Sequence, residues 1–316
     1  MTVTQAGAIP SGEQIVLQPI LYADLFDYPL TFAEIYNFLE RDATPDQVSC
    51  WLSEAVQGGR LAHSDSLYHL PGRDNLVPLR RSRRQMAQNL WSQAERYSHW
   101  LAALPFVTMI AVTGSLAVNN PRTATDDIDL LIVTLPGRLW LCRAFIILLV
   151  RLARIRGVQL CPNFLITENA LNFEQNLFVA REILQMKPLY GRRPYHLILD
   201  RNGWMRGYFP HNWPAPLAPD VDKLTFWQRA AKAGGQLLLA GFPGNWLEQR
   251  LRHYQIAKHT RQAARRNSID TTIFTADICK GHYDGHGQRT LARYQQRLES
   301  IAGQNGAHTN GKQGGK

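Results

Sequence analysis

Acidic side chains are scarce in this sequence of 316 residues, which carries 25 Asp and Glu against 35 Lys and Arg. The formal charge of +10 and the isoelectric point near 9.7 favour a polyanionic partner. A nucleoside triphosphate, a nucleic acid or an anionic membrane surface would each satisfy this charge, and charge alone does not choose among them.

Cysteine is also rare, and long apolar runs are missing. The four cysteines lie far apart, and three of them fall in apolar periodic segments, so we expect reduced core residues and not a disulfide framework. The first residues, MTVTQAGAIPSGEQ, lack the basic start and apolar run of a signal peptide. Residues 139–152 are too short to span a bilayer and include Arg143 and Arg151, which favours a buried crossover helix. We therefore expect a cytoplasmic protein without a transmembrane segment.

Residues 111–134, AVTGSLAVNNPRTATDDIDLLIVT, contain the densest group of chemically useful residues. An apolar run over 106–112 predicts a strand that ends before Gly114 and Ser115. The next predicted strand, 127–133, begins with Asp127 and Asp129, which project from one face about 7 Å apart. Paired carboxylates without a basic residue between them favour a hard divalent cation. Gly114 allows close approach of a phosphate, and Ser115 adds a hydroxyl at the start of a short helix.

These residues resemble the hallmark of the polymerase-β-like nucleotidyltransferase superfamily: an apolar strand, Gly114-Ser115, the spacer 116–126, and Asp127-x-Asp129 on the next strand. The resemblance covers about two dozen residues closely and extends loosely over 105–200. The alternative is an ordinary βαβ unit whose two aspartates end a loop.

The resemblance implies a metal-dependent transferase that moves a nucleoside monophosphate from ATP or another nucleoside triphosphate to a hydroxyl acceptor. Asp127 and Asp129 would hold Mg²⁺ or Mn²⁺, and Gly114 and Ser115 would hold the β- and γ-phosphates. Arg122, in the spacer, is a candidate contact for the triphosphate. The acceptor would be a small molecule, a protein side chain or an RNA end.

The third predicted strand, 158–167, lacks the carboxylate that active members of this superfamily place there. Asn163 occupies its middle and is a candidate metal ligand, but an amide cannot take up a proton. Three alternatives remain: Glu168 supplies the carboxylate in a shifted register, a later residue does so, or the site binds nucleotide without transfer.

The segment after this strand predicts a helix within 169–185, in which we interpret Glu174 and Glu182 as surface charges. A break at 187–191 follows. Lys187, Arg192 and Arg193 beside this break are further candidate phosphate contacts. Residues 196–200 predict a short edge strand.

Residues 14–75 predict three short helices followed by a hairpin, which resembles a winged helix-turn-helix domain. The exposed side of the third helix carries no Lys or Arg; its residues are Asp46, Gln47, Ser49, Ser53, Glu54 and Gln57. Because a helix that approaches phosphates is usually basic, a packing or protein-interaction role is favoured over DNA binding.

The predicted fold class is α+β: a small mixed-sheet nucleotidyltransferase core flanked by the winged-helix-like module and a helical C-terminal region. The predicted segments are a flexible lead 1–13, the winged-helix-like domain 14–75, the core with its leading helix 76–200, a linker 201–222, a helical domain 223–302 and a disordered tail 303–316.

Two basic segments are candidate contacts for nucleic acid or another anionic partner: Arg80, Arg81, Arg83 and Arg84, and the predicted helix 245–266. Two other functions compete with transfer. One is a nucleotide-binding sensor or scaffold with a degenerate transferase fold, and the other is a winged-helix DNA-binding regulator.

Overall fold

The structure of the chain is a computed structural model that describes residues 11–214, 217, 222–265, 272–281 and 286–310. Helices and one mixed sheet of six strands account for most of these residues, which confirms the α+β class. The chain divides into two compact units. The first comprises Met1–Arg81, Trp204–Trp213 and Gln288–Lys316, and the second comprises Ser82–Gly203 and Pro214–Gly287.

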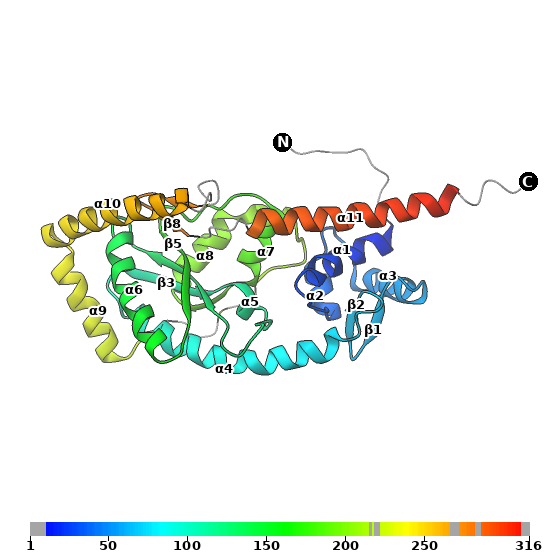
Figure 1. The fold of residues 1–316 in the computed structure, drawn as a ribbon, viewed down its shortest axis with the longest axis horizontal. Coiled ribbons are helices and arrows are strands. Elements are labelled where there is room, and N and C mark those ends of the chain that lie inside the picture. Colours follow the sequence, from blue (N-terminus) through cyan, green and yellow to red (C-terminus); the bar gives the residue numbers. More distant parts are fainter. Residues whose placement is uncertain (1–10, 215–216, 218–221, 266–271, 282–285, 311–316) are drawn as a thin grey trace, which may run out of the picture. The chain divides into compact units, whose positions relative to one another are not determined.

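The first unit contains the predicted helices and hairpin near the N-terminus (Figure 1). Its elements are α1 Gly12–Asp24, α2 Phe32–Asn37, α3 Pro45–Gln57, β1 Ala62–Ser64, β2 Leu67–His69, the first residues of α4 Leu76–Ala102, most of the 3-10 turn Gly203–Gly207 and most of α11 His286–Asn310. Ser11, Thr31 and Thr44 each cap a helix in a capping box. The side of α3 predicted to be exposed is exposed.

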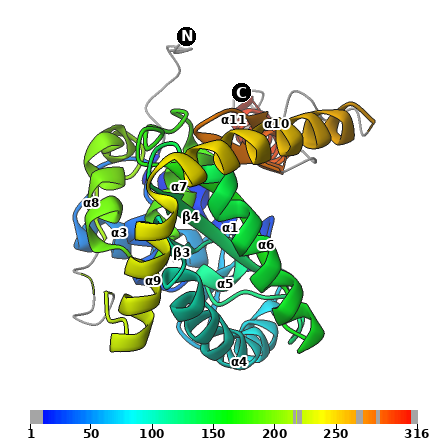
Figure 2. The same cartoon turned by 90° about the vertical axis from the view of Figure 1, so that its left-hand side faces the viewer.

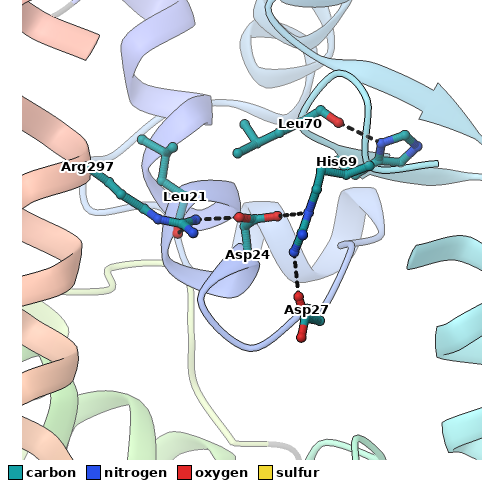
Figure 3. A network of polar contacts seen from close by, with 7 residues as sticks. Leu21, Asp24, Asp27, His69, Leu70 and Arg297 are labelled. Atoms are coloured by element: carbon teal, nitrogen blue, oxygen red, sulfur yellow. Dashed lines mark hydrogen bonds and ion pairs between the residues drawn. The ribbon is translucent and has the colours of Figure 1, made fainter. Parts of the chain in front are cut away.

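Asp24 is the buried charge that ties this unit together (Figure 3). Its Oδ1 accepts a hydrogen bond from Arg73 Nε at 3.0 Å, and its Oδ2 accepts one from Arg297. Arg73 also contacts Asp27 at 2.5 Å through Nη2. A buried carboxylate requires such compensation, so residues from distant parts of the sequence are held at one point.

The second unit is built on the sheet, whose strand order is β6-β3-β4-β5-β8-β7. The strands are β3 Val107–Val112, β4 Ile128–Thr134, β5 Leu160–Thr167, β6 Lys187–Tyr190, β7 Ile273–Phe274 and β8 Ile278–Lys280. Only β4 and β5 run parallel, and the helix α6 Leu139–Ile155 connects them; the other neighbours are antiparallel. The remaining helices are α5 Gly114–Ala117, α7 Leu177–Gln185, α8 Arg192–Arg201, α9 Phe226–Leu239 and α10 Phe242–Arg265.

The main core lies between the sheet and the helices α4 and α6. Alternate residues of β4 enter this core: Ile128, Leu130 and Ile132. Since side chains alternate along a strand, Asp129 projects from the opposite face of the sheet.

The N-terminus of α6 has no side-chain cap of its own, and buried Glu248 of α10 supplies one. Its carboxylate accepts hydrogen bonds from the backbone N–H groups of Trp140 at 3.2 Å and Leu141 at 2.7 Å. These bonds satisfy donors that a helix start otherwise leaves unpaired, and they attach α10 to α6.

Several local predictions were wrong. Residues 196–200 belong to the helix α8 and not to an edge strand, whereas part of the predicted break forms the edge strand β6. The strands β7 and β8 were not predicted. The tail predicted from Gly303 is helical as far as Asn310. Residues 1–10 of the predicted lead and 311–316 of the tail lie outside the described residues.

The arginine-rich start of α4 finds its anionic neighbours within the chain. Arg80 forms two hydrogen bonds of 2.9 Å with the carboxylate of Glu34, and Arg81 pairs with Asp65 at 2.8 Å. Buried Arg83 donates to the side-chain oxygen of Asn120 at 3.0 Å. Among the described residues, no helix has the length and apolar character needed to cross a bilayer.

We expect Arg80→Ala to lower the free energy of unfolding by about 2 kcal/mol, because it leaves a partly buried carboxylate without its partner. Burial by itself would raise the pKa of Glu34, but the hydrogen bond and charge of Arg80 outweigh burial and hold this pKa below its usual value. The stabilisation is therefore present above the ordinary glutamate pKa and is lost as the pH falls through the lowered one.

Urea unfolding of wild type and variant measures this difference. Arg81→Ala is the matched control, since both partners of its ion pair are largely exposed, and its effect should stay within about 0.5 kcal/mol. Equal losses in the two variants would contradict the assignment.

Candidate functional site

The turn between β3 and α5 brings the backbone of Gly114 against a carboxylate. Gly114 has φ +64°, and a Cβ atom placed there would lie 2.5 Å from Oδ2 of Asp129. The turn is held to α4 at its far end by the Arg83–Asn120 bond and by Trp91, whose Nε1 donates to Asn119 at 2.8 Å. Glycine is therefore required here by both backbone conformation and space.

Asp127 and Asp129 lie where the sequence analysis expected them, at the start of β4. Asp129 is the second residue of the strand and is half-buried, whereas Asp127 precedes the strand and is exposed. The backbone N–H of Thr113 donates to the carbonyl of Asp129 at 3.0 Å, which places Gly114 beside this carboxylate.

Asn163 reaches Asp129 through an irregularity in β5. Asp129 is opposite Cys161, but Leu131 is opposite Phe164, so β5 contains one extra residue between these pairs. Pro162, which has no N–H for a strand ladder, lies in this bulge. The side-chain amide of Asn163 donates to Oδ1 of Asp129, and its oxygen accepts from the Cys161 thiol at 2.8 Å. Asn163 thus contacts the candidate metal ligand Asp129 directly.

Glu182 is the functional candidate that the sequence analysis missed. It was interpreted as a surface charge, but it lies on α7 close enough to Asp129 to influence its ionisation, and it accepts a hydrogen bond from the N–H of Gly114. The position of Glu182 between two buried residues of α7, Arg181 and Ile183, is the signal for a site that is not fully exposed. Gly114 therefore lies between two carboxylates, and its N–H is engaged by one of them.

The carboxyl groups of Asp129 and Glu182 both have raised pKa values. Burial, followed by the charges of Glu182 and Asp127, raises the pKa of Asp129 to about 7 against the opposing hydrogen bond from Asn163. Burial raises the pKa of Glu182 to about 7 in spite of the bond from Gly114. Burial and the neighbouring aspartates also raise the pKa of the Cys161 thiol to about 12, which keeps this thiol neutral.

The donor chemistry fits a hard cation held by few protein ligands. Within the described part of the chain, no three His, Cys, Asp or Glu side chains lie together so that they could hold a metal ion. Magnesium is commonly bound by one or two carboxylates together with water and substrate phosphates. Asp129 and Glu182 match that arrangement, and the amide oxygen of Asn163 is directed at Cys161.

Other sequence candidates lie elsewhere. Glu168 follows the end of β5, and its N–H donates to Thr134, five residues along β4 from Asp129 or about 17 Å away. Glu168 therefore does not supply the third carboxylate at Asp129. The side chain of Arg122 is exposed, and its backbone N–H donates to Asp126 at 2.7 Å. Ser115 is half-buried in α5 beside Gly114.

The three basic candidates near β6 are separated by the structure. Lys187 is exposed and pairs with Val112, so it lies at the same end of the sheet as Gly114. Arg192 and Arg193 begin α8 beyond the other end of β6, where they line a shallow cavity of about 440 Å³. Arg192 there faces Asp222 at 3.7 Å.

Comparisons with protein-family models, with curated proteins and with solved structures found no match to this chain.

We expect Gly114→Ala to lower the free energy of unfolding by about 2–4 kcal/mol, because the new methyl group meets the Asp129 carboxylate and the backbone keeps a left-handed conformation. Gly137→Ala is the control: its φ is +68° but nothing lies within 4 Å of the added atom, so the loss should be about 1 kcal/mol. Urea unfolding compares the two. Similar losses would show that backbone conformation alone, and not contact with Asp129, requires Gly114.

The raised pKa of Asp129 predicts a pH-dependent stability. An aspartate in the unfolded chain titrates near pH 4, so between about pH 4 and 7 the folded state holds the extra proton. The free energy of unfolding should therefore fall as the pH rises through this range. Asp129→Asn should reduce this fall and stabilise the protein by about 1–2 kcal/mol at pH 8, a value discounted for partial solvent screening.

Urea unfolding at pH 5 and pH 8 tests this expectation, with Asp200→Asn as the control because Asp200 is exposed on α8. A variant that loses stability equally at both pH values would contradict it.

Proposed function

We propose that this protein binds a nucleoside triphosphate with Mg²⁺ or Mn²⁺ around Gly114 and transfers the nucleoside monophosphate to a hydroxyl acceptor. The observation that supports this best is the pair Asp129 and Glu182, two carboxyl groups on either side of a glycine turn, each with a pKa of about 7. The reaction class comes from the resemblance of residues 111–134 to nucleotidyltransferases.

In this proposal Asp129 and Glu182 hold the cation, and water and the substrate phosphates would complete its ligands. The bound cation would neutralise the charge of the triphosphate and polarise the α-phosphorus. Lys187, at the same end of the sheet, offers a positive charge to the outer phosphates. The Gly114 N–H is engaged by Glu182, so its phosphate role would require that bond to be exchanged.

The transfer step requires one proton to be moved. The acceptor hydroxyl oxygen forms a bond to the α-phosphorus, the bond from that phosphorus to the bridging oxygen of the β-phosphate breaks, and pyrophosphate leaves with the bonding pair. A carboxylate oxygen of Glu182 that does not bind the cation accepts the hydroxyl proton. Asn163 cannot do this and instead orients Asp129 through its amide.

A second function is a nucleotide-binding sensor or scaffold without transfer. Its supporting observation is Asn163, which occupies the strand position of the usual carboxylate and donates to Asp129. The N-terminal helices and hairpin would then form a winged-helix-like protein-interaction module. The DNA-binding regulator has less support, because α3 exposes no Lys or Arg along its predicted recognition side, and Arg80 and Arg81 are paired with Glu34 and Asp65.

The test is incubation of the protein with each α-³²P-labelled nucleoside triphosphate, Mg²⁺ or Mn²⁺, and a total cell extract. Wild type should transfer label to an acceptor, and Asp129→Asn and Glu182→Gln should each reduce the rate at least about 100-fold. Glu174→Gln is the matched control, since Glu174 is exposed just before α7, and it should keep the wild-type rate.

Calorimetric titration of magnesium–ATP separates the two functions. Binding that depends on Asp129, without any transfer of label, would support the sensor. Wild-type affinity and wild-type transfer in both Asp129→Asn and Glu182→Gln would refute the site assignment.

A further inference from the structure

Large apolar side chains cover the outward side of α9 and the start of α10, which meet at a corner in the second unit (Figure 2). The most exposed are Leu237 at 82%, Phe242 at 81% and Trp227 at 79%. The docking face, as we define it, consists of Phe226, Trp227, Leu237, Leu238, Phe242 and Trp246. Exposed apolar groups gathered in this way mark a surface that another body covers.

The inward sides of the same helices combine apolar contacts with hydrogen bonds, and Leu239, Leu247 and Leu251 pack against the core. Lys232 Nζ of α9 donates to the carbonyl oxygens of Ala102 at 2.7 Å and Val107 at 2.6 Å. On α10, Glu248 caps α6, and buried Gln255 donates to the carbonyl of Trp140 at 3.0 Å. Surface helices usually turn their apolar stripe toward the core. These two helices have apolar residues toward the core and a second set of large apolar residues exposed to solvent.

One row along α10 combines aromatic and cationic residues. Phe242, Trp246, Arg250, Tyr254 and Lys258 follow one another at intervals of four, so that neighbours in the row lie one turn apart and the row winds around the helix, and all are exposed. The Arg250 guanidinium lies 5.6 Å from the centre of the Trp246 ring. Aromatic rings with long cationic side chains beside them are typical of a helix that lies at a lipid headgroup layer.

Charge distinguishes among the bodies that could cover this face. Residues 223–265 carry eight Lys and Arg, and their single acidic residue, Glu248, is buried against α6. A second copy of the chain would place like charges together, which is unfavourable. An anionic bilayer provides both an apolar interior for the docking face and phosphates for Arg250 and Lys258.

We propose that the docking face binds the surface of an anionic lipid bilayer, with Trp227, Leu238 and Phe242 at the acyl boundary and Arg250 and Lys258 at lipid phosphates. This surface is separate from the residues around Gly114, and the proposal does not depend on the transfer reaction.

The experiment is co-sedimentation of the full chain with vesicles of phosphatidylglycerol and phosphatidylcholine, and with vesicles of phosphatidylcholine alone. Wild type should bind the anionic vesicles at least about tenfold more tightly, and 0.5 M salt should weaken this binding. Trp227→Ser/Leu238→Ser should lower the partition coefficient about tenfold or more, because two exposed apolar groups no longer enter the lipid.

Leu148→Ser/Ile155→Ser is the matched control, because it removes two exposed apolar residues of α6 and should leave lipid binding unchanged. Circular dichroism confirms that both variants are folded. Equal lipid binding by wild type and Trp227→Ser/Leu238→Ser, or no binding by wild type, would overturn the proposal. A Trp227-dependent dimer on size exclusion, without vesicle binding, would also overturn it and would assign the face to a second copy. Trp227-dependent retention on polyglutamate, without vesicle binding, would overturn it and assign the face to an acidic protein.

Discussion

Burial of two carboxyl groups beside Gly114 is the constraint on which this part of the second unit depends. Asp129 comes from the sheet and Glu182 from a helix, and the backbone of the glycine turn lies between them. The N–H of Gly114 and the amide of Asn163 donate to the two carboxylates and oppose the effect of burial, which raises both pKa values to about 7. Such a site gains most from a cation and is poised to accept a proton.

The helices of the second unit differ in the kinds of contact that they make with the core. α4 and α6 contribute apolar side chains to the core beside β3 and β4, as expected for helices that cover a sheet. α9 and α10 add hydrogen bonds of Lys232, Glu248 and Gln255 to the apolar contacts that they make with the core. Burial lowers the pKa of Lys232 to about 8, because it disfavours the charged ammonium group. The hydrogen bonds by which Lys232 attaches α9 therefore require a charged group to be removed from water. Both helices keep their exposed apolar side chains available for another surface.

Local signals in the sequence predicted much of the fold. Capping boxes at Thr31 and Thr44 located α2 and α3, and apolar runs located β3, β4 and β5. The two candidate aspartates lie at the predicted strand start. The missed strands have a common cause, which is long-range pairing: β6 forms because it pairs with β3, and β8 because it pairs with β5. Glu182 was missed for the same reason, since only the packing of α7 shows that its surroundings include Asp129. Pro162 could have indicated the bulge that directs Asn163 to Asp129.

The first unit is discontinuous in sequence, and this has a consequence for synthesis of the chain. Arg297 completes the compensation of Asp24, and the hydroxyl of Tyr294 donates to Glu40 at 2.7 Å. These residues leave the ribosome after the whole second unit has been made. While the inserted unit is made and folds, the N-terminal helices therefore lack the Arg297 partner of buried Asp24. The contacts that complete the first unit join residues far apart in the sequence. The second unit is able to mature first, so the part of the chain that is made earliest is the last to reach its final state.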